Sequence, residues 1–238
     1  MLSVGAWPQP DYIELYVVFD GLTGLTNIAT REPVTHTYGF DRLVTERLGP
    51  FDMRSAAYSV SYTDYLSRYD NMSPMKIRFS VSFYFQTPAN VASGILMVSP
   101  IPDILRFSVV ANQSHLEIHS HQPWPRGYQE ESRQVAIAGG MFLSHRWTFV
   151  AFTYDGFEEQ LLIYNDIGEV VERRDEFSMD LGGIQRLWVG EGWRNGKRLT
   201  MDLSTAISCL SVHGTVLTPA EIRLLPCTCE MKGKAVSV

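Results

Sequence analysis

Short segments in which apolar and polar residues alternate are spread along most of the chain. The clearest is residues 76–86, KIRFSVSFYFQ, in which every second side chain is apolar. A period of two places these apolar side chains on one face of a β-strand and the polar ones on the other. We therefore expect a half-buried strand whose inward positions are Ile77, Phe79, Val81, Phe83 and Phe85.

Comparable segments follow one another along the chain, and turn residues separate them. Further strands are predicted at residues 12–19, 56–62, 93–98, 105–111, 115–120, 147–154, 160–164, 170–173, 186–189 and 207–212. Pro, Gly, Asn and Asp between them predict tight connections, including hairpins across residues 112–114 and around Asp155-Gly156. This pattern is typical of an all-β fold, and we predict a sandwich of antiparallel sheets.

One helix is predicted, close to the C-terminus. Thr218 is suited to cap its N-terminus, Pro219 to occupy its first position, and Glu221 to close a capping box. We expect this helix to be short and to end before Pro226. No internal repeat or low-complexity linker divides the chain, so residues 1–230 are predicted to form one domain and residues 231–238 a flexible tail.

Composition narrows the classes of function. Of the 238 residues, 45% are hydrophobic and 19% are charged, which is enough to bury a core and argues against disorder. The formal net charge of -6 at pH 7 argues against general nucleic-acid binding. No apolar run approaches the ~18 residues that cross a bilayer, and the start, MLSVGAWPQP, does not resemble a signal peptide.

The cysteines and one sequence triplet indicate an extracellular or cell-surface setting. Cys227 and Cys229 are too close for a relaxed bridge to each other, but either could pair with Cys209. The unpaired cysteine could then bridge two chains into an oligomer. Asn112-Gln113-Ser114 fits the N-glycosylation pattern and lies where a hairpin turn would expose Asn112.

Six segments appear in an order that is known from one group of β-sandwiches. They are residues 56–66, 79–85 (FSVSFYF), 146–155 (RWTFVAFTYD), 162–168 (LIYNDIG), 187–190 (LWVG) and 207–222. In this order they resemble the laminin G-like and pentraxin-like domains of the concanavalin A-type jelly rolls, over roughly Tyr12 to Leu225. The resemblance implies an antiparallel jelly roll, and it suggests a non-enzymatic extracellular module that binds a protein or glycan partner through its rim loops.

The same resemblance implies a disulfide near the C-terminus. Laminin G members often carry a cysteine directly before the position of Ile207, where this chain has Ala206 and places its cysteine at residue 209. The pairing we prefer on this basis joins Cys209 to Cys227.

Trp147 begins the most characteristic of these segments. Its large apolar area favours burial, and we expect it to fill the interior of the sandwich at the mouth of a strand. Phe149, Ala151 and Thr153 should share its face of the strand, with Phe152 and Tyr154 on the other.

The resemblance also implies a possible calcium site at the rim. A laminin G-type ligand is an aspartate just before a strand, a position that Asp103 occupies here. A second ligand would come from Asn195 or Asp202. The basic character of residues 191–198 disfavours the acidic double site of pentraxins.

Those basic residues suggest a partner site of their own. Arg194, Lys197 and Arg198 flank Asn195-Gly196, a strong two-residue hairpin signal, and Trp193 lies beside them. A rigid tip with three cations and an aromatic ring could bind a sulfated or sialylated glycan, or an acidic protein face. The alternative, which we favour for this feature taken alone, is a solvated turn.

A polar stripe is predicted on the strand 115–121. His115, Glu117, His119 and His121 share one face, and two of them could reach a zinc ion. The apolar Leu116 and Ile118 explain the same spacing as the solvated face of a half-buried strand, which we favour.

Catalytic patterns are missing from the sequence. It has no nucleophile elbow, metalloprotease or phosphate-loop motif, and no alternating acid pair of the kind that jelly-roll glycoside hydrolases use. We therefore predict a recognition module, with a carbohydrate-binding lectin as the first alternative and a glycoside hydrolase as a weaker one.

Overall fold

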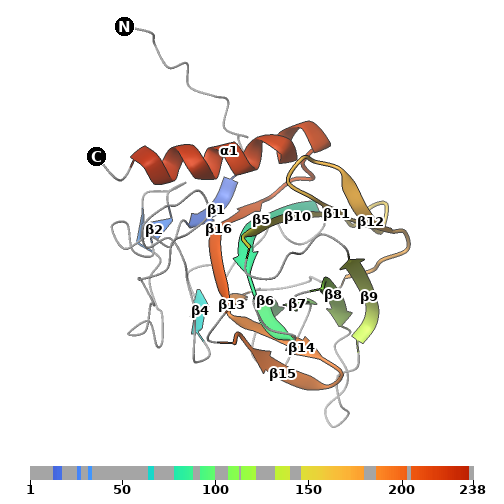
Figure 1. The fold of residues 1–238 in the computed structure, drawn as a ribbon. Helices are drawn as coiled ribbons and strands as arrows, with labels where there is room; N and C mark the ends of the chain where they lie inside the picture. The colour runs from blue at the N-terminus through green and yellow to red at the C-terminus, as the bar shows by residue number, and fades with distance from the viewer. Residues whose placement is uncertain are drawn as a thin grey trace, which may run out of the picture.

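Two antiparallel sheets of six strands each form the body of the protein (Figure 1). The computed structural model describes residues 13–17, 26–27, 32–33, 64–66, 78–87, 92–99, 107–112, 114–121, 132–139, 146–179, 186–202 and 205–235. The first sheet has the order β1 (Ile13–Val17), β16 (Ala206–His213), β5 (Arg78–Gln86), β10 (Thr148–Asp155), β11 (Gln160–Tyr164) and β12 (Val170–Arg174). The second has the order β4 (Asp64–Leu66), β13 (Arg186–Val189), β6 (Ser93–Ser99), β7 (Phe107–Ala111), β8 (His115–His121) and β9 (Ser132–Gly139).

Two small hairpins and one helix complete the described elements. β2 (Thr26–Asn27) pairs with β3 (Glu32–Pro33), and β14 (Glu191–Arg194) pairs with β15 (Lys197–Thr200). The helix is α1 (Pro219–Ala235). The predicted antiparallel sandwich with a single C-terminal helix is confirmed, whereas β2, β3, β4 and β9 were not predicted. The predicted strand at 56–62 lies outside the described residues.

The core between the sheets follows the predicted alternation. Phe79, Val81, Phe83 and Phe85 of β5 point into it and are at most 1% exposed. The rings of Phe79 and Phe107 stack across the two sheets, with their centroids 5.7 Å apart. A large apolar area is thereby removed from water, which is the main stabilising term for this sandwich.

The outer face of the first sheet is also covered, by α1 and the segment before it. Tyr84 and Phe149 on the sheet pack in one cluster with Leu217, Ile222 and Leu225. Ser80 on the same face accepts a hydrogen bond from the Leu217 amide. Strand β5 is therefore buried on both faces, and the prediction of a half-buried strand is wrong because the helix returns over it.

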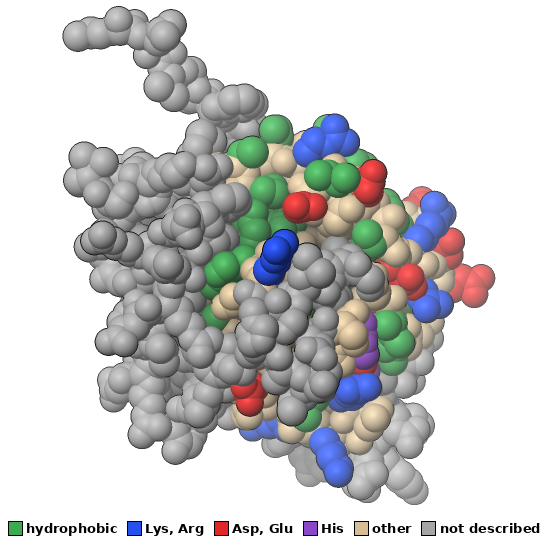
Figure 2. Space-filling view, viewed as in Figure 1, with side chains coloured by type: hydrophobic (Ala, Val, Ile, Leu, Met, Phe, Trp, Pro, Cys, Tyr) green, Lys and Arg blue, Asp and Glu red, His purple; other side chains and the backbone are tan. Residues whose placement is uncertain are grey.

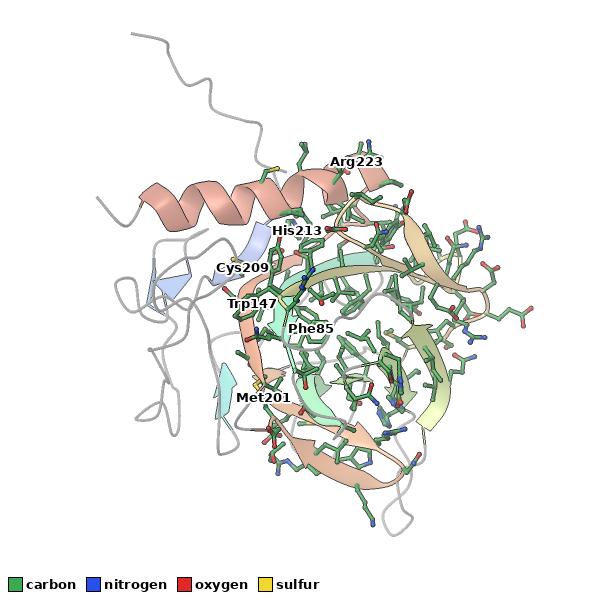
Figure 3. All side chains as sticks on the ribbon, viewed as in Figure 1. Phe85, Trp147, Met201, Cys209, His213 and Arg223 are labelled. Carbon is green, nitrogen blue, oxygen red and sulfur yellow. The ribbon has the colours of Figure 1, made fainter. Side chains whose placement is uncertain are left out.

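Trp147 lies on this helix side and not in the sandwich interior. It is partly buried and packs against the cluster beneath α1, and Phe149 and Ala151 share its face as predicted (Figure 3). Phe152 and Tyr154, on the opposite face of β10, belong to the main core. The expectation that Trp147 fills the interior is thus wrong, because the alternation of β10 places it on the outer face.

The helix begins as predicted and ends later. The Thr218 amide donates to Glu221 Oε2 at 2.7 Å, and the Glu221 amide donates to Thr218 Oγ1 at 3.3 Å, which confirms the capping box. The helix then passes through Pro226 to Ala235, beyond its predicted end and beyond the predicted domain boundary at residue 230. Proline has no N–H to bond the carbonyl four residues earlier, and the neighbouring Ile222 and Leu225 are buried in the cluster on the first sheet.

The cysteines differ from the preferred pairing. Cys209 is disulfide-bonded and lies on the helix side of β16 (Figure 3), in a bulge where its φ angle is 51°. Cys227 is an exposed free thiol. The predicted Cys209–Cys227 bridge is therefore wrong. Among the described residues, no helix is long and apolar enough to cross a membrane.

Candidate functional site: a buried charged cluster beneath a basic hairpin

The hairpin β14–β15 has the geometry that its sequence predicts. Four residue pairs join the strands, and the last pairs Arg194 with Lys197. Asn195 and Gly196 form the two-residue turn with φ angles of 51° and 71°. Positive φ at both central positions is the type I′ requirement, which Asn-Gly meets with little strain. The tip is therefore well defined.

The stem of this hairpin lies flat on the outer face of the second sheet, across β6 and β7. A Cβ atom added to Gly94 would lie 2.2 Å from the Gly192 nitrogen, and one added to Gly192 would lie 2.8 Å from Val110 Cγ2. Glycine is thus required at both positions, because backbone packs directly on backbone. This close contact of the two backbones fixes the distance between the sheet and the strand that carries Trp193 and Arg194.

Glu117 on β8 is the centre of a charged cluster where the hairpin ends. Its Oε1 accepts from His115 Nε2 at 2.7 Å and pairs with Arg194 Nη2 at 3.0 Å. Its Oε2 accepts from His119 Nε2 at 2.8 Å. Glu117, His119 and His121 are each less than 5% exposed. The prediction of a solvated face on β8 is therefore wrong, because residues distant in sequence cover it.

The electrostatics of the cluster keep Glu117 ionised. Burial alone would raise its pKa, but hydrogen bonds from His119 and His115 and the charge of Arg194 outweigh burial and lower the pKa to about 2. A carboxylate that is buried and charged at neutral pH is a fixed anchor for the cation beside it.

A second set of contacts ties the hairpin backbone to the same face. Ser108 Oγ donates to the Trp193 carbonyl at 2.9 Å and lies 3.2 Å from His121 Nε2. Because Ser108 has one proton to give, His121 Nε2 must carry the proton of that contact. Burial, together with the charge of His119, lowers the pKa of His121 to about 3, so this imidazole is neutral. The buried His121 Nδ1 and Trp193 Nε1 make no hydrogen bond within the described part of the chain.

The three predicted cations of the hairpin have different environments. Arg198 binds Glu191, which is fully buried, through contacts of 2.6 to 2.9 Å. Arg194 is paired with Glu117, and Lys197 is exposed at the tip. The tip is therefore not a cluster of three free cations, because Arg194 and Arg198 are each paired with a buried carboxylate. Trp193 is half-buried, so it is not a freely exposed aromatic ring.

Arg194 remains accessible despite this pairing. Its side chain is 35% exposed, and that of the neighbouring His115 is 27% exposed. Figure 2 shows histidine surface (purple) close to Lys and Arg side chains (blue) at the lower right of the molecule. We call the exposed atoms of His115, Arg194 and Lys197 the Arg194 surface.

The predicted calcium site stays a prediction, because its first ligand, Asp103, lies outside the described residues. The two alternatives for the second ligand lie on the hairpin: Asn195 is at its turn, and Asp202 follows its open end. The described residues contain no group of three or more His, Cys, Asp or Glu side chains able to hold a metal. Glu117 instead accepts hydrogen bonds from two of the three histidines considered for zinc, His115 and His119.

The buried carboxylates are poorly suited to glycoside hydrolysis. Within the described residues these are Glu117 and Glu191, and each is engaged by an arginine. A glycosidase acid needs a raised pKa to hold its proton, whereas the pKa of Glu117 is lowered. Neither group has the environment of a general acid.

No protein-family model matches the chain, and no curated protein matches it either. Solved structures do match its fold. A structure from work on botulinum neurotoxin type C, a toxin whose cell entry is dependent upon interaction with two ganglioside molecules, has a TM-score of 0.60 at 13% identity and covers 92% of this chain. A carbohydrate-binding module of family 40 from a Ruminococcus gnavus sialidase, bound to alpha2,3 sialyllactose, has a TM-score of 0.52 at 14% identity and covers 71% of this chain.

This chain shares the β-sandwich fold of these binding domains. A third neighbour, the binding domain of botulinum neurotoxin DC in complex with rat synaptotagmin II, has a TM-score of 0.59 at 12% identity and covers 92% of the chain. This chain spans about half the length of the toxin structures, 51% and 52%, and 96% of the sialidase module. The neighbours support the β-sandwich fold and do not single out laminin G or pentraxin domains.

The sequence identified Arg194 and His115 separately but not as neighbours. Glu117 contacts both residues, but the alternation of β8 predicted that its side chain faces solvent. Its position between two histidines at i−2 and i+2 was the available signal, since a carboxylate flanked in this way on one strand face can accept from both.

Proposed function

We propose that this chain is a non-enzymatic recognition module that binds a sialylated glycan at the Arg194 surface. The observation that carries the proposal is the contact between Arg194 and the buried Glu117. An arginine with five N–H donors uses only part of its donor set on this one acceptor residue, and the side chain of Arg194 is 35% exposed. Glu117 holds the side chain in place, so binding costs little conformational entropy.

Ligand chemistry follows from the guanidinium. Its planar fork matches a carboxylate through two parallel hydrogen bonds, and sialic acid carries such a carboxylate. His115 lies beside it with both ring nitrogens already engaged, by Ser114 and Glu117, and Lys197 adds positive charge at the tip. The net charge of -6 disfavours anions in general, so an anionic sugar needs a locally basic surface such as this one.

The fold comparisons add support to this proposal. One neighbour is bound to sialyllactose, and another is a toxin that depends on gangliosides. The second candidate is an acidic protein partner, which the exposed Lys197 favours, and one neighbour is in complex with a protein. Membership of the laminin G-like group, a calcium ion at Asp103 and an extracellular setting are further parts of the proposal. The disulfide at Cys209 supports that setting.

Titration calorimetry with alpha2,3-sialyllactose, alpha2,6-sialyllactose and lactose tests the proposal. We expect the wild type to bind a sialylated sugar and not lactose. Arg194→Ala should weaken binding at least about tenfold, and Arg194→Lys, which keeps the charge but loses the fork, should weaken it less.

Arg173→Ala is the matched control, because Arg173 forms an exposed ion pair on β12. Equal binding of lactose, or an equal loss in the Arg173 variant, would refute the glycan proposal. Binding of an acidic peptide without any sialyllactose binding would favour the protein partner.

A further inference from the structure

The turn between β7 and β8 holds the side chain of Asn112 in one orientation. Its Oδ1 accepts from the Ser114 amide at 2.8 Å, from Ser114 Oγ at 2.8 Å and from the His115 amide at 3.0 Å. The backbone N–H of Asn112 donates to the His115 backbone carbonyl at 3.0 Å. The carbonyl end of this side chain is thus fully used within the turn.

The nitrogen of the Asn112 side chain, Nδ2, is not used in the turn. Asn112 Nδ2 donates no hydrogen bond among the described residues, and it is not among their buried unpaired nitrogens. Ser114 is exposed, and Asn112 is only partly buried. A substituent on Nδ2 would therefore project into solvent and would break no contact of the folded turn.

We propose that Asn112 carries an N-linked glycan. The triplet Asn112-Gln113-Ser114 supplies the acceptor pattern. In this transfer a lipid-linked oligosaccharide pyrophosphate is the donor. A bond forms between Nδ2 and the first sugar carbon, the bond from that carbon to the pyrophosphate oxygen breaks, and the Nδ2 proton leaves with the lipid pyrophosphate. No oxidant or reductant is needed.

The disulfide is a second and independent observation for the compartment that this reaction needs. Cys209 is buried and disulfide-bonded, which is expected of a chain that folds in an oxidising environment. N-glycosylation takes place in the same secretory environment, so both features have one explanation.

The glycan would stand beside the Arg194 surface. Ser114 Oγ lies 2.9 Å from His115 Nδ1, and the other nitrogen of that ring bonds Glu117, which pairs with Arg194. One chain of hydrogen bonds therefore connects the acceptor turn to the cation. The occupancy of Asn112 does not rest on the proposed sialic-acid function.

Mass spectrometry of the full chain tests this inference. The 238-residue chain is given a secretion leader and expressed in cultured animal cells, and the peptide that contains Asn112 is analysed before and after peptide N-glycosidase treatment. We expect a glycopeptide that the enzyme converts to the aspartate form. An unmodified Asn112 in the secreted wild type would overturn the inference.

Two substitutions of one exposed residue make a matched pair. Ser114→Ala destroys the acceptor triplet and Ser114→Thr keeps it, and both retain the Asn112 contacts to the backbone amides. We expect the glycan to be lost from the first variant and kept by the second, with similar melting temperatures. A glycan that persists at Asn112 in Ser114→Ala would contradict the assignment. This readout is independent of sugar binding, so failure of the proposed function would leave it unaffected.

Discussion

Nη2 of Arg194 lies 3.0 Å from Oε1 of Glu117, so a solvent-facing cation rests on a carboxylate whose side chain is 5% exposed. The two residues come from β14 and β8, which are 77 positions apart in the chain (194 minus 117). Removing either partner therefore affects both the stability of the hairpin and the surface above it.

Glu117→Gln should destabilise the protein by about 2 kcal/mol, because a neutral amide cannot balance Arg194 and still accept from both histidines. Urea unfolding at pH 7 measures this change. Asp175→Asn is the control, since Asp175 pairs with Arg173 in the solvent and its loss should change stability little. Similar losses in the two variants would show that the buried cluster has no special role.

Gly94→Ala should displace the β14–β15 hairpin, because the new Cβ would overlap the Gly192 nitrogen and the Leu199 carbonyl oxygen. We expect a loss of about 1–3 kcal/mol in the free energy of unfolding, together with a shifted indole signal from Trp193 in NMR spectra. Gly139→Ala is the control, because nothing lies within 4 Å of a Cβ there. An unshifted Trp193 signal in Gly94→Ala would contradict the packing described.

Ile222→Ala should cost about 2–4 kcal/mol, since this fully buried side chain holds α1 on the first sheet. Leu224→Ala, two residues along the same helix, should cost about 0.5 kcal/mol or less, because Leu224 is 46% exposed. Thermal or urea unfolding compares the two. Equal effects would mean that α1 contributes little to stability through its packed face.

Acid should destabilise the protein from about pH 6.5 downward, before the carboxylates titrate. Burial lowers the pKa of His213 to about 4, although Glu221 opposes this shift, and the pKa of His121 is lowered to about 3. Between these values and 6.5 the unfolded chain binds protons that the folded chain does not, so the free energy of unfolding falls as the pH falls. Below about pH 4.5, protonation of Glu117 in the unfolded chain adds to the loss.

For His213 alone the loss by pH 4 is on the order of 2–3 kcal/mol. Its ring lies beneath α1 (Figure 3), where Nε2 bonds Ser211 at 3.1 Å. Unfolding of His213→Gln followed from pH 7 to pH 4 should show a shallower slope than that of the wild type. An unchanged slope would mean that His213 is charged or solvated in the folded protein.

Periodicity predicted most of the architecture because the inner faces of β5 and β10 follow it without interruption. It failed where both faces of a strand are covered. The outer positions of β5 and β8 carry Ser, His and Glu, which alternation assigns to water. In the fold, α1 and the β14–β15 hairpin cover them, and hydrogen bonds such as Ser82 to Ser211 at 2.7 Å satisfy the polar groups.

The candidate site was only partly predictable for the same reason. Asn195-Gly196 specifies its own turn locally, so the hairpin tip was predicted correctly. The ion-pair partners of Arg194 and Arg198 depend on where the hairpin packs on the second sheet, and this position is set by tertiary contacts. Glu117 is distant in sequence, and Glu191 could not be recognised as buried because β14 was not predicted as a packed strand.

The glycine contact between Gly94 and Gly192 separates the hairpin into two parts that can change independently. The stem is immobilised by the main chain itself, so its position does not depend on which side chains decorate the turn. Lys197 can therefore be exchanged while Asn195-Gly196 keeps the turn, and under the proposed function a library at this position should change the sugar preference on an unaltered scaffold.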